Sequence, residues 1–446
     1  MNLTYKVEDR PPFGQVIVFA FQQLLAILAA TIAVPAIIGN GMSSSAALFG
    51  AGVGTIIYLL FTRFKSPVFL GSSFAFIGSM FSAFAGGVSM SLGYLGLILG
   101  AVFGGLVYVV LALIVKAVGV DWINKLMPAV VIGPTVAIIG LSLAGNAIGD
   151  LSSGSVYNAD GMQLASNYVC LICGLVTLFV TMLCSVFGKK MLKMIPFIIG
   201  ICSGYVLAAI FTVIGNSMGI DSLKIIDFSS FANMKWVPDF TFVTAFKGGY
   251  DFGEVGSMGA YIGTIAAAYV PVAFVVFAEH IADHKNLSSI IDQDLLENPG
   301  LHNTLLGDGV GSMVGAFFGG CPNTTYGESV GCVAISGNAS VITILTTAIM
   351  AIIASFVAPF VTFLATIPSC VMGGVCVALY GFIAVSGLKM IQNVDLNDNC
   401  NLFTVSVILI AGIGGLSVSF GSVTITEVAC ALILGIITHI VLQKKK

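Results

Sequence analysis

The amino-acid sequence predicts an all-α polytopic membrane protein with fourteen transmembrane segments, arranged as two inverted repeats of seven. Three observations lead to this fold class. The 446 residues are 58% hydrophobic and only 8% charged, which leaves too little charge to cover a soluble surface. Apolar runs of about twenty residues recur along the chain, and a helix of that length crosses a hydrocarbon core of about 30 Å. A short motif also occurs once in each half of the chain.

The predicted spans follow the apolar stretches between charged or turn-forming residues. They lie near 14–37, 44–62, 68–86, 93–116, 126–147, 167–187, 194–216, 258–281, 303–320, 323–337, 339–365, 369–388, 401–419 and 422–442. Lys and Arg collect in the cytoplasmic loops of membrane proteins. With both termini in the cytoplasm, this order places all of the 17 Lys and Arg residues on that side except Lys224, Lys235 and Lys247. We therefore expect a multi-pass protein of the cell membrane.

The second half of the chain repeats a motif of the first half. Pro128-Ala-Val-Val-Ile-Gly133 recurs as Pro368-Ser-Cys-Val-Met-Gly373, and the two copies open the fifth and twelfth predicted spans. Because seven spans separate them, and seven is odd, the two halves must lie in the membrane with opposite topology. The repeat therefore predicts a seven-plus-seven inverted arrangement.

The third and tenth predicted spans are short and make poor continuous helices. They contain Pro67-Val-Phe-Leu-Gly-Ser-Ser-Phe-Ala-Phe76 and Pro322-Asn-Thr-Thr-Tyr-Gly-Glu-Ser-Val-Gly331, in which Gly, Ser and Thr lower helix propensity and proline removes a backbone donor. Unwound backbone is tolerated in a bilayer only where it is buried in protein or lines a cavity. Broken spans at matching positions of inverted halves predict a substrate site near the midplane; the alternative is a kinked helix without a ligand.

Two carboxylates lie in these surroundings, Glu279 at the end of an apolar run and Glu328 in the tenth span. A carboxylate at the centre of a helix costs about 2.5–3.5 kcal/mol on insertion scales, and neither span contains a Lys or Arg to pair with it. Such groups exchange protons, which favours coupling to protons over coupling to sodium. Asp283 lies one turn after Glu279 on the same helical face and is the expected second proton carrier, or else an ordinary acid at a helix end. His280 and His284 are expected to point elsewhere.

Phe74, Tyr326 and Tyr380 lie beside the broken spans or the repeated motif. An aromatic ring stacks on a flat ligand, although most aromatic residues in such a chain only pack. Together with unwound backbone and carboxylates, these rings predict a planar, polar, uncharged ring as the substrate. Asp308 and Glu427 are expected to have packing or lipid-boundary roles.

Other function classes fit the sequence poorly. Cys170 and Cys173 lack the further ligands of a zinc site, so we expect neither a metal nor a cofactor. The histidines are scattered and no nucleophile has a positioned base, which argues against an intramembrane enzyme and leaves no catalytic residue to name. Nucleic acid is an unsuitable partner because the only basic cluster is the terminal Lys444-Lys445-Lys446.

Several motifs carry a resemblance to a known family. They are Ala278-Glu-His-Ile-Ala-Asp-His284, Asp294-Leu-Leu-Glu-Asn-Pro-Gly-Leu-His302, Asn323-Thr-Thr-Tyr-Gly-Glu328, Leu70-Gly-Ser-Ser-Phe-Ala-Phe76 and Tyr380-Gly381. With these motifs the chain resembles the nucleobase–ascorbate transporter family (nucleobase:cation symporter 2), especially its bacterial uracil permeases, nearly from end to end. The resemblance implies proton-coupled symport of uracil by alternating access, in a homodimer.

The resemblance also implies an organisation and a set of site residues. A core domain would comprise residues 1–117 (spans 1–4) and 251–366 (spans 8–11), and a gate domain residues 118–250 (spans 5–7) and 367–446 (spans 12–14). Glu279 and Glu328 would accept hydrogen bonds from ring N–H groups, and backbone amides at Phe74 and Gly327 would bind ring carbonyls. The pocket would also be lined by Ser73, Tyr326 and Tyr380. Purine and urate relatives usually carry Gln at position 328, so Glu328 favours a pyrimidine.

Three positions depart from the family pattern. Ser329 replaces the Asn of the signature, Asp283 replaces a His of the best-known uracil permeases, and Gln22-Gln23 replaces a Gln-His pair in the first span. Two alternatives remain open: a carrier of xanthine or another nucleobase, and an anion exchanger or channel on the same inverted fold. The anion carrier would more often place a basic residue, or no charge, at the broken helices.

Overall fold

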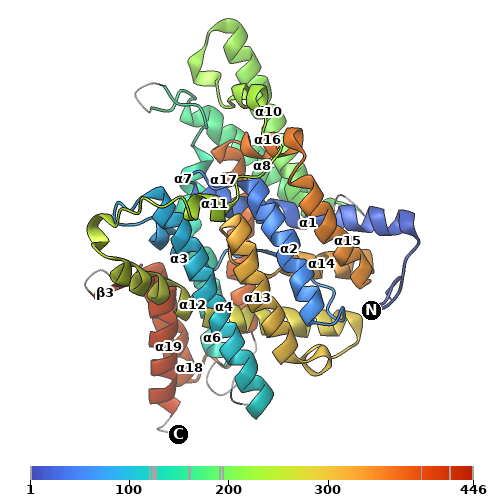
Figure 1. The fold of residues 1–446 in the computed structure, drawn as a ribbon, viewed down its shortest axis with the longest axis vertical. Coiled ribbons are helices and arrows are strands. Elements are labelled where there is room, and N and C mark those ends of the chain that lie inside the picture. Colours follow the sequence, from blue (N-terminus) through green and yellow to red (C-terminus); the bar gives the residue numbers. More distant parts are fainter. Residues whose placement is uncertain are drawn as a thin grey trace.

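A computed structural model gives the fold of the chain and describes residues 3–119, 122, 128–158, 162–189, 192, 195–392, 394–420 and 423–443 (Figure 1). Its longer helices are α1 (Phe13–Ile38), α2 (Ser44–Phe61), α4 (Met90–Val118), α8 (Asn167–Phe187), α10 (Pro196–Met218), α12 (Met258–Ile291), α13 (Leu301–Gly319) and α17 (Ser369–Met390). The shorter helices are α3 (Ile77–Ala83), α6 (Ala129–Ser142), α7 (Ala144–Leu151), α11 (Thr241–Ala245), α14 (Gly327–Ser336), α15 (Val341–Ala354), α16 (Ala358–Ala365), α18 (Asn399–Ile413) and α19 (Glu427–Gln443).

The predicted class of all-helical membrane protein is confirmed. Within the described residues, eight helices are long and apolar enough to cross a membrane, or nine if α15 and α16 form one bent span. The eight are α1, α2, α4, the run Ala129–Leu151 formed by α6 and α7, α8, α10, α12 and α17. The count of fourteen crossings stays a prediction. Some of the residues on which this count was based lie outside the described residues. They are the start of the fifth span, Lys125, Lys190, Lys193 and the three terminal lysines.

The predicted spans differ from the helices found in several places, and two of these differences have a clear local cause. The predicted span 339–365 is divided into α15 and α16, which are bent by 83°, because Pro359 at the start of α16 cannot donate a backbone hydrogen bond to the preceding turn. The predicted span 401–419 is helical only to Ile413, since Gly415 adopts a φ of 70°. The chain then forms an antiparallel ribbon of β3 (Val418–Phe420) and β4 (Val423–Ile425).

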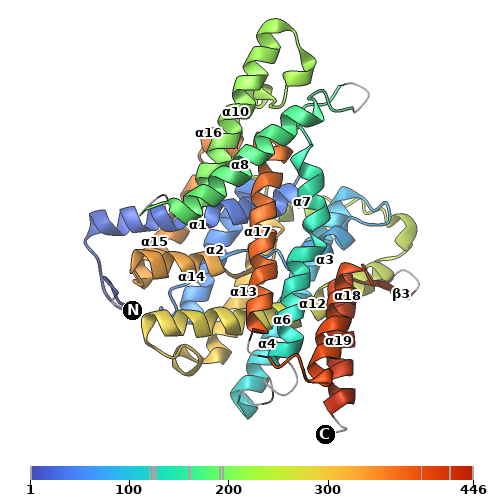
Figure 2. The ribbon, with the colours of Figure 1, turned by 180° about the vertical axis from the view of Figure 1, so that it is seen from behind.

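The helices form two groups that lie on opposite sides of the molecule. α13 packs against α2 and α4, whereas α17 packs against α6 and α8. The first group lies in front in Figure 1 and the second in Figure 2.

The predicted third and tenth spans both contain extended backbone, and the two extended segments pair. β1 (Leu70–Ser72) runs antiparallel to β2 (Asn323–Thr325), with Gly71 opposite Thr324. Each strand leads into a short helix, α3 after β1 and α14 after β2. All six strand residues are buried, so the pairing satisfies backbone groups that would otherwise be orphaned inside the protein.

Candidate functional site

Glu279 of α12 and Glu328 in the first turn of α14 converge on one small cavity of about 50 Å³. The other lining residues are Ser73, Phe74, Ala75, Ile139, Thr324, Thr325, Tyr326, Gly327 and Ile383. Six of the sequence-predicted site residues therefore line it: Ser73, Phe74, Glu279, Tyr326, Gly327 and Glu328. Tyr380 does not line this cavity, but its ring contacts Phe74 edge-on, with centroids 5.9 Å apart.

The paired strands fix the backbone around this cavity. The Ser73 N–H donates to the Pro322 carbonyl over 2.9 Å, and the Tyr326 hydroxyl donates to the Ser72 carbonyl over 2.7 Å. The Tyr326 ring lies directly over Gly71, where a Cβ would overlap the ring atoms. Glycine is therefore required at this position for the Tyr326 ring to pack against the strand pair.

A wider cavity of about 340 Å³ adjoins the small one and shares Glu279, Gly327, Glu328 and Ile383 with it. Asp283 lines the wider cavity, and its Oδ2 accepts a hydrogen bond from the Thr325 hydroxyl over 3.0 Å. The three carboxylates thus share one continuous space. Among the described residues that line either cavity there is no Lys or Arg.

A third cavity, of about 20 Å³, continues from the other end of the site. It shares Phe74, Ala75 and Ile139 with the small cavity and is also lined by Thr426 and Glu427. The site therefore opens widely toward Ile335 and Met390 and is constricted toward Glu427.

The short helix α14, which carries Glu328, is tied to the N-terminal part of the chain at its beginning. The Gln23 side chain of α1 donates from Nε2 to Ser329 Oγ over 2.5 Å. The Ser329 hydroxyl also accepts from the Phe69 N–H over 2.9 Å, just before β1. Ser329 thus joins α1, the residue before β1 and α14 at the edge of the site.

The far end of α14 is held by a strap formed by residues 4–9. The Thr4 N–H donates to the Gly337 carbonyl over 2.8 Å, and the Ala339 N–H donates to the Tyr5 carbonyl over 2.9 Å. The Val341 N–H donates to the Val7 carbonyl over 3.0 Å, and the Val7 side chain is buried. Both ends of the helix that bears Glu328 are therefore anchored.

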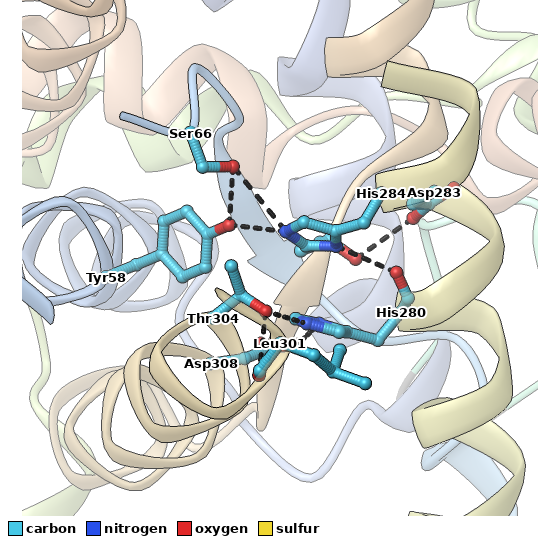
Figure 3. Close-up of polar contacts among 9 residues, drawn as sticks. Tyr58, Ser66, His280, Asp283, His284, Leu301, Thr304 and Asp308 are labelled. Carbon is cyan, nitrogen blue, oxygen red and sulfur yellow. Dashed lines mark hydrogen bonds and ion pairs between the residues drawn. The ribbon is translucent and has the colours of Figure 1, made fainter. Parts of the chain in front are cut away.

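His280 and His284 line neither cavity, in agreement with the expectation that they point elsewhere, and they bind α13 and α2 (Figure 3). Asp308 Oδ2 lies 2.6 Å from His280 Nδ1, and Thr304 Oγ1 lies 3.0 Å from His280 Nε2. The Thr304 hydroxyl donates to the Leu301 carbonyl, so His280 must donate from Nε2. One proton is then shared between Asp308 and His280 Nδ1.

His284 continues this network toward the end of α2 (Figure 3). Its Nδ1 lies 2.8 Å from the His280 carbonyl, which only accepts, so Nδ1 is the protonated nitrogen. Its Nε2 lies 2.6 Å from the Tyr58 hydroxyl, which in turn lies 2.7 Å from Ser66 Oγ.

The network corrects one sequence-based expectation and decides between the two alternatives of another. The histidines are not all scattered, because the rings of His280 and His284 lie 4.1 Å apart. Asp308 is only 1% exposed and is paired with His280, so it has a packing role and not a lipid-boundary role. His280 and His284 are four residues apart, as are Glu279 and Asp283, so each pair lies on one face of α12. This spacing was the signal from which a second polar face of α12 could have been predicted.

The structure offers no group of three or more His, Cys, Asp or Glu side chains suited to a metal ion, within the residues that it describes. Ile139 and Ile383, which complete the cavity, were not predicted as site residues. In so apolar a chain an isoleucine carries no distinguishing signal.

Comparisons with known proteins agree with the geometry of a solute site in a membrane protein. Residues 14–420 match the model of the Permease family. A uracil permease of Bacillus caldolyticus is 38% identical over 442 residues, covering 98% of this chain and 94% of that protein. Uracil permeases of Bacillus subtilis (37%; 99% and 95% covered) and Escherichia coli K12 (34%; 96% and 92% covered) are similar over almost their full lengths.

Two solved structures share the fold. The transmembrane domain of the cyanobacterium bicarbonate transporter BicA has a TM-score of 0.64 at 15% identity, with 98% of this chain and 100% of that one covered. Murine Slc26a9, an anion transporter in the inward-facing state, has a TM-score of 0.65 at 11% identity, with 98% and 69% covered.

Proposed function

The chain belongs to the Permease family, the nucleobase–ascorbate transporters, and from this membership we propose that it takes up uracil together with protons across the cell membrane. Family membership makes it a multi-pass membrane transporter and not an enzyme. The observation that carries the proposal is the convergence of Glu279 and Glu328 on one cavity beside the β1–β2 pair.

The chemistry of this cavity complements a pyrimidinedione ring. Two carboxylates are acceptors for the two ring N–H donors, and charge-assisted hydrogen bonds of this kind are about twice as strong as neutral ones. Backbone amides at Phe74 and Gly327, where the chain enters the short helices, would serve the ring carbonyls. The Tyr326 ring packs over Gly71 of the strand pair, and the Tyr380 ring contacts the Phe74 ring edge-on.

Proton coupling is supported by the charge balance of the site. Glu279, Asp283 and Glu328 share one space without a Lys or Arg among its described lining residues. Three neighbouring carboxylates in an apolar surrounding repel each other unless protons are taken up. Glu279 and Glu328 would exchange a proton with the substrate cycle, and Asp283 would be the second carrier.

Transport would proceed by alternating access between two domains. The core (1–117 and 251–366) would carry the carboxylates, and the gate (118–250 and 367–446) would face them, in fourteen spans with both termini cytoplasmic. The wide cavity reaches Met390 beside Lys389, on the side that the charge pattern assigns to the cytoplasm, so the conformation would be inward-facing. The protein would form a homodimer.

Two alternative functions give different results in the uptake experiment. A xanthine or other nucleobase carrier would use the same carboxylates. An anion exchanger or channel is suggested by the two solved structures, but the described residues lining the cavities are free of Lys and Arg, which disfavours an anionic substrate.

The experiment is uptake of labelled uracil into proteoliposomes, with and without an inward proton gradient, and with excess unlabelled xanthine or bicarbonate. Gradient-driven accumulation that neither competitor reduces is the expected result. Loss of accumulation with xanthine would move the substrate to purines. Uptake independent of the gradient would overturn proton coupling, and absence of uracil uptake would overturn the substrate.

A further inference from the structure

The small cavity has two chemically different walls. The polar wall comes from the segments around β1, β2, α12 and α14 and contains both glutamates and two threonines. The apolar wall is supplied by α6 and α17, which contribute Ile139 and Ile383 to the described lining and no polar side chain.

A pyrimidinedione ring is divided in the same way. Four consecutive ring positions carry N–H or C=O groups, whereas C5 and C6 carry only hydrogen. Unpaired polar groups are costly to bury, so the N–H and C=O positions must face the polar wall. The C5–C6 edge is then left for the isoleucines. This orientation rests on the proposed function.

We propose that Ile139 and Ile383 form a specificity wall that admits pyrimidinediones with an unsubstituted C5–C6 edge and excludes those with a methyl group there. Ile139 is 3% exposed and lies at the constricted end, where the adjoining cavity measures only about 20 Å³. Ile383 lies where the site joins the wide cavity. A β-branched side chain is stiff at χ1, and a packed interior does not yield to an added methyl group without strain.

The wall predicts which substitutions widen specificity. One extra methyl group against a hydrophobic pocket changes discrimination by about 10- to 200-fold. Truncation at Ile139 removes the rigid branch beside the constriction, so it should relax discrimination more than truncation at Ile383, which borders open space.

The test uses the full-length protein in proteoliposomes, as wild type and as the variants Ile139→Val, Ile139→Ala and Ile383→Val. The readout is the concentration of 5-methyluracil or 6-methyluracil that halves labelled uracil uptake, divided by the corresponding concentration of unlabelled uracil. We expect this ratio to fall about tenfold for at least one methyl isomer in Ile139→Ala, and by less in the valine variants. Ile349→Val, on an exposed face of α15, is the matched control and should keep the wild-type ratio.

The outcomes separate this inference from the proposed function. Uracil uptake by the wild type with unchanged ratios in all wall variants would overturn the wall alone. No uracil uptake by the wild type would overturn both the substrate and the orientation built on it. The valine variants keep the test decisive if Ile139→Ala does not fold. An equal fall of the ratio in Ile349→Val would also overturn the wall.

Discussion

Gln23 Nε2 donates a hydrogen bond to Ser329 Oγ over 2.5 Å, and this contact joins residues 306 positions apart in the chain. The resemblance to the family marks both residues as departures from its pattern, and the structure places them against each other at the edge of the site. The Ser329 hydroxyl also accepts a hydrogen bond from the Phe69 N–H. This one hydroxyl therefore holds together the residue before β1 and the first turn of α14.

Ser329→Ala should reduce uracil uptake and stability together. The substitution leaves the Phe69 N–H without its acceptor and removes one of two acceptors of Gln23 Nε2, which also donates to the Ser329 carbonyl over 3.3 Å. A buried donor without an acceptor costs about 1–3 kcal/mol. Uptake in proteoliposomes and the thermal unfolding midpoint in detergent measure the effect. In a double-mutant cycle with Gln23→Ala, we expect a coupling of about 0.5–3 kcal/mol between the two residues. Strictly additive effects would contradict a direct role of this contact.

Glu279→Gln and Glu328→Gln should each lower uracil uptake about 10- to 100-fold, because a hydrogen bond to a charged group contributes about 1.5–3 kcal/mol. Membrane insertion should remain intact, as judged by the amount of purified protein. Glu254→Gln is the matched control, since Glu254 is exposed outside the site. Wild-type uptake by both site variants would refute the assignment of these residues.

Gly71→Ala should impair uptake, because the new Cβ overlaps the Tyr326 ring and displaces it from the strand pair. Gly259→Ala makes the same chemical change where no atom lies within 4 Å of the added carbon, and it should be neutral. The two variants are compared by the uracil concentration that gives half-maximal uptake. Equal values would show that the position of Tyr326 does not matter.

Asp308→Leu should lower stability by about 1–3 kcal/mol, because it leaves the buried Nδ1 of His280 without its hydrogen-bond partner. Asp308→Asn should be milder, since the amide can still donate to His280 Nδ1 when the histidine is neutral. Unfolding midpoints in detergent test this order. Asp221→Asn, at a side chain that is 63% exposed, should shift the midpoint little. If leucine at position 308 is tolerated as well as asparagine, the shared-proton pair is unimportant for stability.

Val7→Asp should weaken the strap that holds the end of α14, because it places a charge at a buried position. We expect a lower unfolding midpoint and lower uptake. Glu8→Ala changes the adjacent exposed residue and should have no comparable effect. The idea fails if both variants behave alike.

The sequence by itself determined the membrane class, the broken segments and the carboxylates. The length of an apolar helix can be read from hydropathy, and Gly, Ser, Thr and Pro act on the local backbone. The stretches 67–76 and 322–331 could therefore be predicted as broken segments before the pairing of β1 and β2 was known. A carboxylate in an apolar run is costly wherever it lies, which singled out Glu279 and Glu328. Local sequence patterns were a poorer guide to the ends of helices. α18 ends at Ile413, and the β3–β4 ribbon that follows it was not indicated by any apolar pattern.

Only the tertiary structure decided which group each of these residues meets. The contacts of Ser329 with Gln23, of His280 with Asp308 and of Tyr58 with His284 join segments far apart in the chain, and sequence periodicity does not encode such pairings. The apolar wall of Ile139 and Ile383 is a similar case. Isoleucines that face lipid, core or cavity are chemically identical, so their role depends on the packing of α6 and α17 against the site and not on residue type.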